Sequence, residues 1–381
     1  MLNGLIRCAL VLLCVLYSHQ SLSALNEVLL LKHKDIEQSL AFNVQLPKGY
    51  SKNTDKTYNL LFDFHPMADK YLAGIHQWLS HNGEWPWPQT IIVTPKMGNP
   101  VGRLFDESGD STPLIDFFEA SLIPAIDAKY RTNGFRIFSG FRVNGTLVLS
   151  SLINKPNLFN AHIVTSPELN DDYAQILSKL PKALRKMGNK PQFLWVGHGN
   201  WNKEADNQEA FKQLHSMLQS HAPASLDWHF EVFADNYFMS LPLLSLINAV
   251  ERLFNDINNG LEPTSPASQK GAMALVEHFA YLSKYKYGFD VSAAASIRGL
   301  GEHQLTHSPE QALITFKTYA ELYPDSAYAY HYLAQAYLAN KDVNKALESQ
   351  KQAVAMSQSM LSWHKKHIAK QLTKIEALTE Q

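Results

Sequence analysis

The chain has 381 residues, of which 45% are hydrophobic and 18% are charged, and its formal net charge is −1. This length exceeds what one ordinary core accommodates, so we expect one large domain and a smaller one. The near-zero charge argues against a nucleic acid or an anionic membrane as a partner bound through bulk electrostatics.

The first 24 residues resemble a secretory signal. Arg7 precedes an apolar run over residues 8–17, and small residues follow it. The run is shorter than the roughly 20 apolar residues that cross a membrane. We expect cleavage and export to the periplasm or beyond, with an uncleaved N-terminal anchor as the alternative.

Both cysteines, Cys8 and Cys14, lie inside this segment. The exported chain would contain no cysteine, which excludes disulfides, thiol catalysis and thiolate metal sites. We predict no cofactor and no metal site.

Strand and helix patterns alternate downstream. In residues 38–50, apolar and polar side chains alternate, which predicts an antiparallel strand that is ended by Pro47 and Gly49. Further strands are predicted at 58–64, 90–94, 135–138, 161–166, 192–196 and 226–233, and helices at 71–79, 114–130, 204–219 and 243–254. This order predicts an α/β fold with a mostly parallel, doubly wound sheet.

Residues 137–149 read IFSGFRVNGTLVL, an apolar strand, a sharp turn and the start of an apolar-faced helix. Glycines on either side of such a turn let strand and helix pass closely, and the strained turn exposes a nucleophile in G-x-S-x-G hydrolases. Gly140 and Gly145 supply small residues here, but Arg142 holds the central position and Asn144 stands at the second glycine. A guanidinium stays protonated and has no lone pair with which to attack.

Asn258 to Gly260 and the stretch PTSPAS break the alternation and predict a linker at 259–270, between an α/β domain at 25–258 and a helical domain at 271–381. Ala312 and Ala346 lie 34 residues apart, the period of a tetratricopeptide repeat, with two ordinary helical hairpins as the alternative. Such helices bind a protein partner or serve as a packing appendage.

The order of these features resembles the enterochelin-esterase-like branch of the α/β-hydrolases, over residues 37–256. The segments that carry the resemblance are FNVQLPKGY, SLIPAIDAKYRT, FSGFRVNGTLVLSSLINKPNLFNAHIVTSPEL, FLWVGHGN and SLPLLSLINAVERLF. The resemblance implies an α/β-hydrolase fold and an esterase activity, and secreted members of this branch often carry a C-terminal tetratricopeptide segment.

The functional positions of that branch do not carry over. Its elbow reads G-H-S-x-G-G, whereas residues 140–145 read GFRVNG, and its D-H-G-S-x-P histidine segment corresponds to residues 237–242, YFMSLP. Phe238, which follows Tyr237, therefore replaces the histidine. The acid is expected in the loop after Val196, where Glu204 and Asp206 are candidates. The oxyanion loop reads His65-Pro66, and Pro66 has no backbone N–H to donate.

Loss of the serine or the histidine alone lowers turnover about as much as loss of the whole triad, roughly 10⁶-fold. We therefore expect an inactive esterase homologue that binds a small molecule or peptide in the former cleft, or a protein partner through its helical domain. The alternative is a carboxylic-ester hydrolase that uses displaced residues around Ser139, His65 and His198. Ser139 and Thr146 are otherwise explained by capping or packing.

Eight residues form the candidate cleft: Asp63, His65, Arg142, Asn144, His198, Glu204, Tyr237 and Phe238. Arg142 would bind a carboxylate or phosphate, or form a salt bridge with Asp63 or Asp235. Because the central elbow residue is normally strained, we expect the elbow to relax or an acid to hold Arg142.

Two further groups have open interpretations. His65 and His198, with Asp63 or Glu204, would form a base or a metal site, or lie together by chance. The cluster Trp78, Trp85 and Trp87 would stack on a sugar or aromatic ligand, or pack a lid.

Overall fold

The computed structural model describes residues 26–33, 36–65, 67–80, 86–96, 105 and 113–379. The predicted export segment at 1–24 lies outside the described residues, and so do both cysteines. Among the helices that are described, none is long and apolar enough to cross a membrane.

The chain divides into two compact units. The first comprises Met1–Lys186, Trp195–Ala222 and His229–Leu246, and the second comprises Met187–Leu194, Pro223–Trp228 and Ile247–Gln381. The division falls inside α8 (Leu241–Leu253), ahead of the predicted linker at 259–270.

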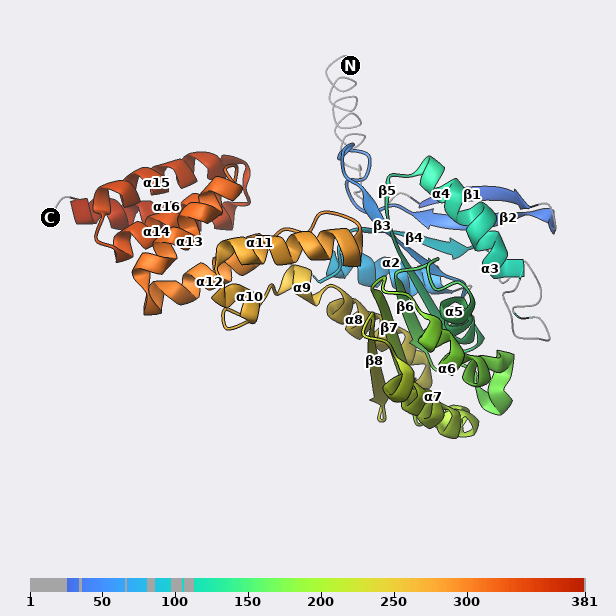
Figure 1. Cartoon of the computed structure of the whole chain (residues 1–381). Coiled ribbons are helices and arrows are strands. Elements are labelled where there is room, and N and C mark those ends of the chain that lie inside the picture. Colours follow the sequence, from blue (N-terminus) through green and yellow to red (C-terminus); the bar gives the residue numbers. More distant parts are fainter. Residues whose placement is uncertain are drawn as a thin grey trace, which may run out of the picture. The chain divides into compact units, whose positions relative to one another are not determined.

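An eight-stranded sheet is the framework of the fold (Figure 1). Its strands are β1 (Asn26–His33), β2 (Ile36–Gln45), β3 (Tyr58–Asp63), β4 (Thr90–Pro95), β5 (Thr132–Phe141), β6 (Ala161–Thr165), β7 (Gln192–Gly199) and β8 (Leu226–Phe233), in the order β1-β2-β4-β3-β5-β6-β7-β8. β3 pairs in parallel with β4 and β5, and β5 with β6, whereas β1 and β2 run antiparallel to their neighbours. The predicted mostly parallel sheet is confirmed.

Burial explains the predicted strand patterns. All six residues of β3 and all six of β4 are buried, as expected of strands covered on both faces. The flanking helices of this unit are α2 (Ala68–Leu79), α3 (Pro113–Phe117), α4 (Ile123–Lys129), α5 (Val143–Asn154), α6 (Ile176–Lys186), α7 (Gln208–His221) and α8.

An aromatic core lies beneath the strand that leads into the elbow. The predicted helix at 114–130 contains a π-helical turn, Phe118–Leu122, between α3 and α4. Phe118 packs against Phe62, Phe138 and Phe159 with ring centroids 5.5, 5.2 and 5.8 Å away, and all four side chains are fully buried. The end of β5 therefore rests on a close-packed, rigid base.

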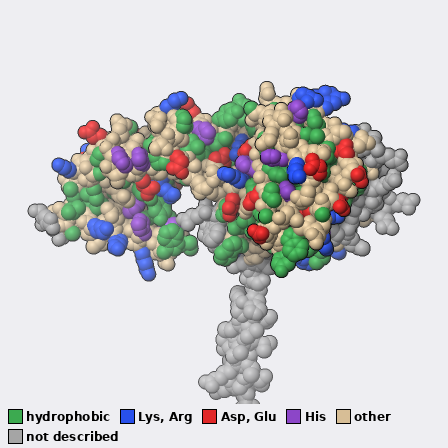
Figure 2. Space-filling model, turned by 90° about the horizontal axis from the view of Figure 1, so that it is seen from below, with side chains coloured by type: hydrophobic (Ala, Val, Ile, Leu, Met, Phe, Trp, Pro, Cys, Tyr) green, Lys and Arg blue, Asp and Glu red, His purple; other side chains and the backbone are tan. Residues whose placement is uncertain are grey.

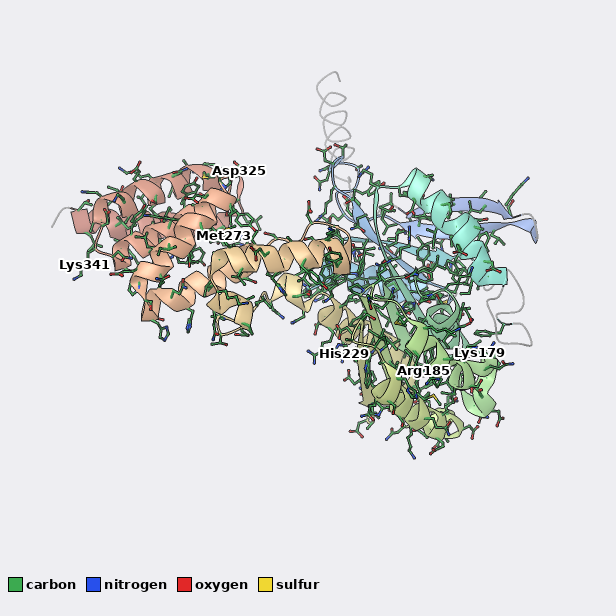
Figure 3. The ribbon with its side chains drawn as sticks, viewed as in Figure 1. Lys179, Arg185, His229, Met273, Asp325 and Lys341 are labelled. Atoms are coloured by element: carbon green, nitrogen blue, oxygen red, sulfur yellow. The ribbon has the colours of Figure 1, made fainter. Side chains whose placement is uncertain are left out.

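The second unit is helical at its C-terminal end, from Asn255 to Thr379, and this part is called the helical unit; the first unit is called the sheet unit. Its helices are α9 (Asn255–Asn258), α10 (Pro266–Gln269), α11 (Ala272–Tyr281), α12 (Ala294–His307), α13 (Pro309–Leu322), α14 (Ala327–Ala339), α15 (Val343–Met356) and α16 (Ser362–Thr379). Short turns join the later helices, and Figure 3 labels Asp325 before α14 and Lys341 before α15. The repeat-like pair Ala312 and Ala346 is fully buried on α13 and α15.

Acidic and basic side chains are interspersed on the face drawn in Figure 2. Such mixing agrees with the net charge of −1.

Candidate functional site

The elbow keeps its strained backbone. β5 ends at Phe141 and α5 begins at Val143, and Arg142 between them has φ 58° and ψ −127°. The Arg142 N–H donates to the Thr165 carbonyl at 3.0 Å, and the Arg142 carbonyl accepts from the Thr146 N–H at 3.0 Å. A side chain in this region of φ/ψ costs about 1–3 kcal/mol. Relaxation of the elbow was one of the two expected outcomes, and it has not occurred.

Two glycines make this geometry possible. A Cβ on Gly140 would overlap the backbone carbonyl of Asn144. A Cβ on Gly145 would lie 3.0 Å from the Thr165 oxygen and 3.1 Å from the Gly140 oxygen. Asn144, a predicted cleft residue, thus contacts the turn through its backbone. The missing side chain of Gly145 lets the start of α5 lie close to the ends of β5 and β6.

An acid holds the Arg142 guanidinium, which was the other expected outcome. Its Nη2 lies 3.0 Å from Glu168 Oε2, and its Nη1 donates to the Lys203 carbonyl at 3.3 Å. The expected partners were Asp63 and Asp235, and that choice was wrong. Glu168 lies just beyond the carboxyl end of β6, the neighbour of β5, and that placement is the signal that would have identified it.

Glu168 belongs to a larger polar network. Its Oε1 accepts from Asn207 Nδ2 at 2.9 Å. The buried Asn207 side chain also accepts from the N–H groups of Leu169 and Asn170, at 2.6 and 2.8 Å. The carboxylate is thus fixed from one side by Asn207 and from the other by Arg142.

Phe238 and Arg142 lie together, as the sequence predicts for the histidine and nucleophile positions. The guanidinium carbon lies 5.6 Å from the centre of the Phe238 ring, which also packs on Phe141 at 4.9 Å. Tyr237 is 71% exposed and its ring lies 5.1 Å from that of Trp201, which is 41% exposed. Sequence reasoning missed Trp201, which forms an aromatic rim with Tyr237.

Asp63 is buried at the end of β3 and is fully engaged. It accepts from Ser139 Oγ at 2.6 Å, from the His65 N–H at 2.8 Å and from Tyr71 Oη at 3.3 Å. Burial raises the pKa of Asp63 to about 6, although these donors oppose the change. Ser139, which donates to this carboxylate, is itself buried, so its hydroxyl is not exposed to solvent.

The two candidate histidines are bound to nearby backbone. His65 Nδ1 accepts from the Met67 N–H at 3.2 Å, and His198 Nδ1 lies 2.8 Å from the Gly199 carbonyl. Burial lowers the pKa of both imidazoles. Within the described residues, no group of three or more His, Cys, Asp or Glu side chains could hold a metal ion.

Glu204 is buried in the position expected of the acid. Its Oε1 accepts from the Gly199 N–H at 3.1 Å, while its Oε2 has no hydrogen-bond partner. Asp206, the other candidate, is exposed and lines a separate hollow of about 440 Å³ beside α7. Pro66 lies outside the described residues.

The predicted tryptophan cluster includes one core residue. Trp87 is buried and donates from Nε1 to Thr90 Oγ1 at 3.1 Å, whereas Trp78 is 63% exposed. Trp85 lies outside the described residues. Trp87 therefore packs the core of the sheet unit.

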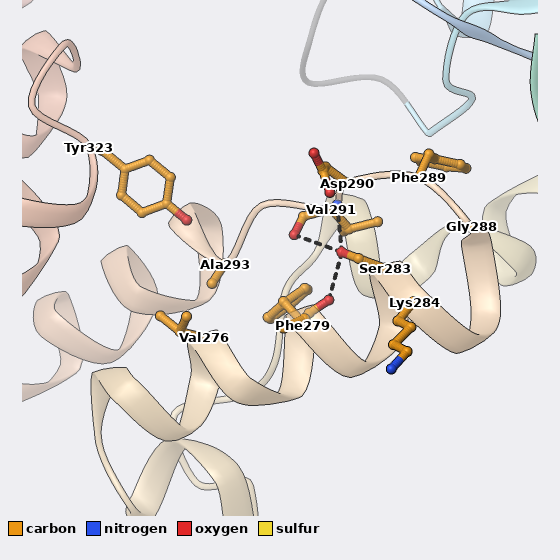
Figure 4. Close-up of a pocket in the computed structure, with 11 residues that line it drawn as sticks. Val276, Phe279, Ser283, Lys284, Gly288, Phe289, Asp290, Val291, Ala293 and Tyr323 are labelled. Carbon is orange, nitrogen blue, oxygen red and sulfur yellow. Dashed lines mark hydrogen bonds between the residues drawn. The ribbon is translucent and has the colours of Figure 1, made fainter.

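The helical unit contains its own hollow of about 610 Å³ (Figure 4). Phe279, Val276 and Val291 contribute apolar walls, and Tyr323 points in from the end of α13. The Ser283 hydroxyl beside it donates to the Phe279 carbonyl at 2.8 Å and accepts from the Val291 N–H at 2.8 Å. The Ser283 hydroxyl is therefore engaged internally, while Lys284 and Asp290 add charged groups to the lining, so the hollow has a mixed polar and apolar surface.

Solved structures share this architecture. An uncharacterised protein from Capnocytophaga ochracea superposes with a TM-score of 0.66 at 15% identity, over 93% of this chain and 100% of its own. An IroE-like serine hydrolase from Shewanella oneidensis superposes with a TM-score of 0.56 at 20% identity, over 74% and 94%. No protein-family model and no curated protein matches the chain.

At these identities the likeness concerns the fold. The strand order and the turn from β5 into α5 agree with it, because they reproduce the sheet and elbow of that fold. The chain therefore has the α/β-hydrolase fold, with a C-terminal helical region.

Proposed function

We propose that this protein is a non-hydrolytic esterase homologue that binds an anionic small molecule or peptide at Arg142. The single observation that carries the proposal is the guanidinium at the tip of an unrelaxed elbow. The strain of about 1–3 kcal/mol has been kept although the residue cannot act as a nucleophile.

Three contacts support the absence of hydrolysis. Phe238 occupies the histidine position and packs on Arg142. The Ser139 hydroxyl donates to Asp63 and is buried. His198 contacts its neighbouring backbone and the ring of Phe211, at 4.2 Å between centroids. None of these contacts pairs a nucleophile with a histidine base, and the one hydroxyl–carboxylate pair, Ser139 with Asp63, is buried.

The surroundings of Arg142 favour exchange of an anion. The side chains of Arg142 and Glu168 are 39% and 21% exposed, and an ion pair of this kind contributes only about 0–1 kcal/mol. Glu168 keeps its bond to Asn207 when Arg142 leaves it. A carboxylate or phosphate can therefore replace Glu168 on the guanidinium at little cost, beside the rim of Trp201 and Tyr237.

Hydrolysis is tested with p-nitrophenyl acetate and the purified mature protein. We expect no turnover above the buffer rate, and no change in Arg142→Ala, Ser139→Ala or His198→Gln. Turnover that disappears in Ser139→Ala or His198→Gln would establish the alternative, a hydrolase with displaced residues.

Binding is tested by calorimetric titration with acetate and inorganic phosphate. We expect Arg142→Gln to abolish binding, and Glu168→Gln to tighten it by up to about fivefold, because it removes a competitor worth roughly 1 kcal/mol. Lys155→Gln, which breaks the surface ion pair with Glu119, is the matched control and should bind like the wild type. Equal affinities of wild type and Arg142→Gln would refute the proposal.

Two further parts of the proposal rest on sequence patterns. The pattern of residues 1–24 supports export. Intact-mass analysis of protein recovered from the periplasm tests this, because cleavage of the segment would lower the mass. The repeat period of Ala312 and Ala346 supports protein contacts through the helical unit. We expect a captured partner to be lost in Phe289→Ala, at the hollow of Figure 4, and kept in Arg142→Gln.

A further inference from the structure

The last helix, α16, rests on α14 and α15 through two small apolar sockets. In each socket one isoleucine of α16 is buried between one alanine of α14 and one of α15. The sockets are Ala327, Ala353 and Ile368, and Ala334, Ala346 and Ile375. Residues of the same helix in the two sockets are seven apart, or two turns. Alanine gives a shallow contact at the centre of each socket, and partly buried hydrophobic side chains surround it: Tyr330, Val354, Met356 and Met360 at the first, and Tyr337, Leu338, Val343 and Leu347 at the second.

A buried polar layer separates the two sockets. His331 lies one turn after Ala327 on α14 and is 1% exposed, and Gln350 on α15 is fully buried. Gln350 Nε2 donates to the Ile368 carbonyl of α16 at 2.7 Å, so its Oε1 faces His331 Nδ1 at 3.2 Å. His331 Nε2 then accepts from Gln335 Nε2 at 2.9 Å. The layer connects all three helices and requires a neutral imidazole in this arrangement.

The N-terminal end of α16 carries the wrong charge for a helix. Lys365 and Lys366 lie in its first turns, between His364 and His367, and it has no acidic residue in its first turn. Cations near a helix N-terminus oppose the helix dipole.

The groups around His331 offer little to stabilise a charge. From α16, His367 faces it with ring centroids 5.2 Å apart, and His364 contacts Tyr328. Arg298 and Glu302 of α12 interact electrostatically with Tyr332, the neighbour of His331. Phe316 of α13 stacks on the Tyr332 ring with the centroids 5.4 Å apart, and Gln350 of α15 contacts His331 itself. The pKa of His331 is lowered to about 4, mainly by burial; the hydrogen bond with Gln350 opposes this change and His367 adds to it.

We propose that the α14–α16 interface is an acid-operated latch, in which protonation of the buried His331 releases α16 and uncovers the two alanine sockets. Protonation replaces a neutral, hydrogen-bonded imidazole with a buried cation next to His367. The Gln335 amide can turn to accept from the cation, but the burial and the facing histidine remain. Release relieves both, and it also frees the basic N-terminal end of α16.

The direction follows from linkage. A histidine whose folded pKa is below its unfolded value stabilises the seated helix fully above about pH 6.5, and this stability is lost as the pH falls toward 4. Between pH 7.5 and pH 4.5 the ratio of seated to released α16 should fall on the order of 100-fold.

Hydrogen exchange of the mature full-length protein, corrected for the intrinsic pH dependence of exchange, tests the latch. We expect peptides from residues 362–379 to lose protection at pH 4.5, while peptides from α14 and α15 keep theirs. Loss of protection in all three helices together, or none in α16, would overturn the proposal.

His331→Gln separates the titration from the packing, because its amide preserves a polar layer that does not ionise. We expect α16 of this variant to be equally protected at pH 7.5 and pH 4.5. His303→Gln, at an exposed histidine of α12, is the control and should behave like the wild type. Acid release that persists unchanged in His331→Gln would refute the assignment.

Discussion

The elbow of the sheet unit and the α14–α16 interface of the helical unit each place a basic side chain against apolar neighbours, and they stabilise it in opposite ways. Arg142 lies on Phe238, stays charged, remains 39% exposed and takes Glu168 as its counter-ion. His331 is buried, gives up its charge and is bound by amides.

The difference follows from the chemistry of the two side chains. A guanidinium does not release its proton at accessible pH, so it must keep water or an acid nearby. An imidazole can be buried by staying neutral, but its burial then makes stability depend on pH. The elbow is therefore held by backbone sterics, whereas the helical interface depends on a neutral imidazole.

The largest effect should come from Gly140→Ala. A Cβ at this position overlaps backbone, which cannot move without opening the turn, so we expect a loss of at least about 3 kcal/mol in unfolding free energy. In the helical unit, Gly301→Ala meets only the ring of Phe316 and should cost about 1–2 kcal/mol. Urea denaturation measures both.

Gly74→Ala is the control for this pair, because nothing lies within 4 Å of the added carbon. On α2 it should stabilise by about 0.5–1 kcal/mol. If Gly140→Ala proved as mild as Gly301→Ala, the elbow would be more deformable than the close approach of its backbone implies.

The next effect concerns pH, and its sign is opposite in the two units. Because the folded pKa of Asp63 is raised to about 6 from 3.8, its contribution to stability is greatest below pH 3.8 and is lost as the pH rises through 6. The loss amounts to about 3 kcal/mol. Asp63→Asn should therefore gain on the wild type between pH 4 and pH 7, whereas the contribution of His331 changes in the other direction.

Ser139→Ala provides the counter-test, since it removes a donor that stabilises the charged carboxylate. It should make the loss of stability above pH 4 steeper in thermal denaturation. A flat difference between Asp63→Asn and wild type over this range would show that the carboxyl is not buried in solution.

The smallest effect concerns residues with a positive φ in the two units, and it compares the stability of their glycine and alanine variants. Glycine at 142 should be more stable than alanine by about 1–2 kcal/mol, because only glycine adopts φ 58° with ψ −127° without strain. At Lys341, with φ 64° in an ordinary turn, the preference should be about 1 kcal/mol. At Lys317, inside α13, alanine should be preferred by about 1 kcal/mol. Alanine and glycine variants of equal stability at 142 would mean that the elbow relaxes in solution.

Much of the sheet could be predicted because its signal is local. The continuous apolar runs of β3 and β4 are direct consequences of burial on both faces. Two elements were missed. The polar stretch that forms α6 contains Pro181, which masks a helical pattern of buried residues, and β1 is a half-exposed edge strand with no clean alternation.

The candidate site was predictable in position and not in its contacts. The spacing of Gly140 and Gly145 located the elbow, and the order of segments located Phe238. The pairing of Arg142 with Glu168 depends on the adjacency of β5 and β6, which no local pattern encodes. The same holds for Trp201, which reaches the rim only because the loops after β7 and β8 come together.

The network behind Glu168 has a consequence for communication within the sheet unit. Asn207 connects Glu168 to the N–H groups of Leu169 and Asn170, and the next residues include Asp171, Asp172, Ala174 and Gln175, all with φ between 52° and 57°. Under the proposed function, an anion that takes Arg142 from Glu168 would change the forces on this strained segment. Occupancy of the elbow would then be coupled to the conformation of the neighbouring segment Asn170–Gln175. An effector that binds this segment would change the anion affinity at Arg142 by the same factor by which the anion changes the affinity of the effector.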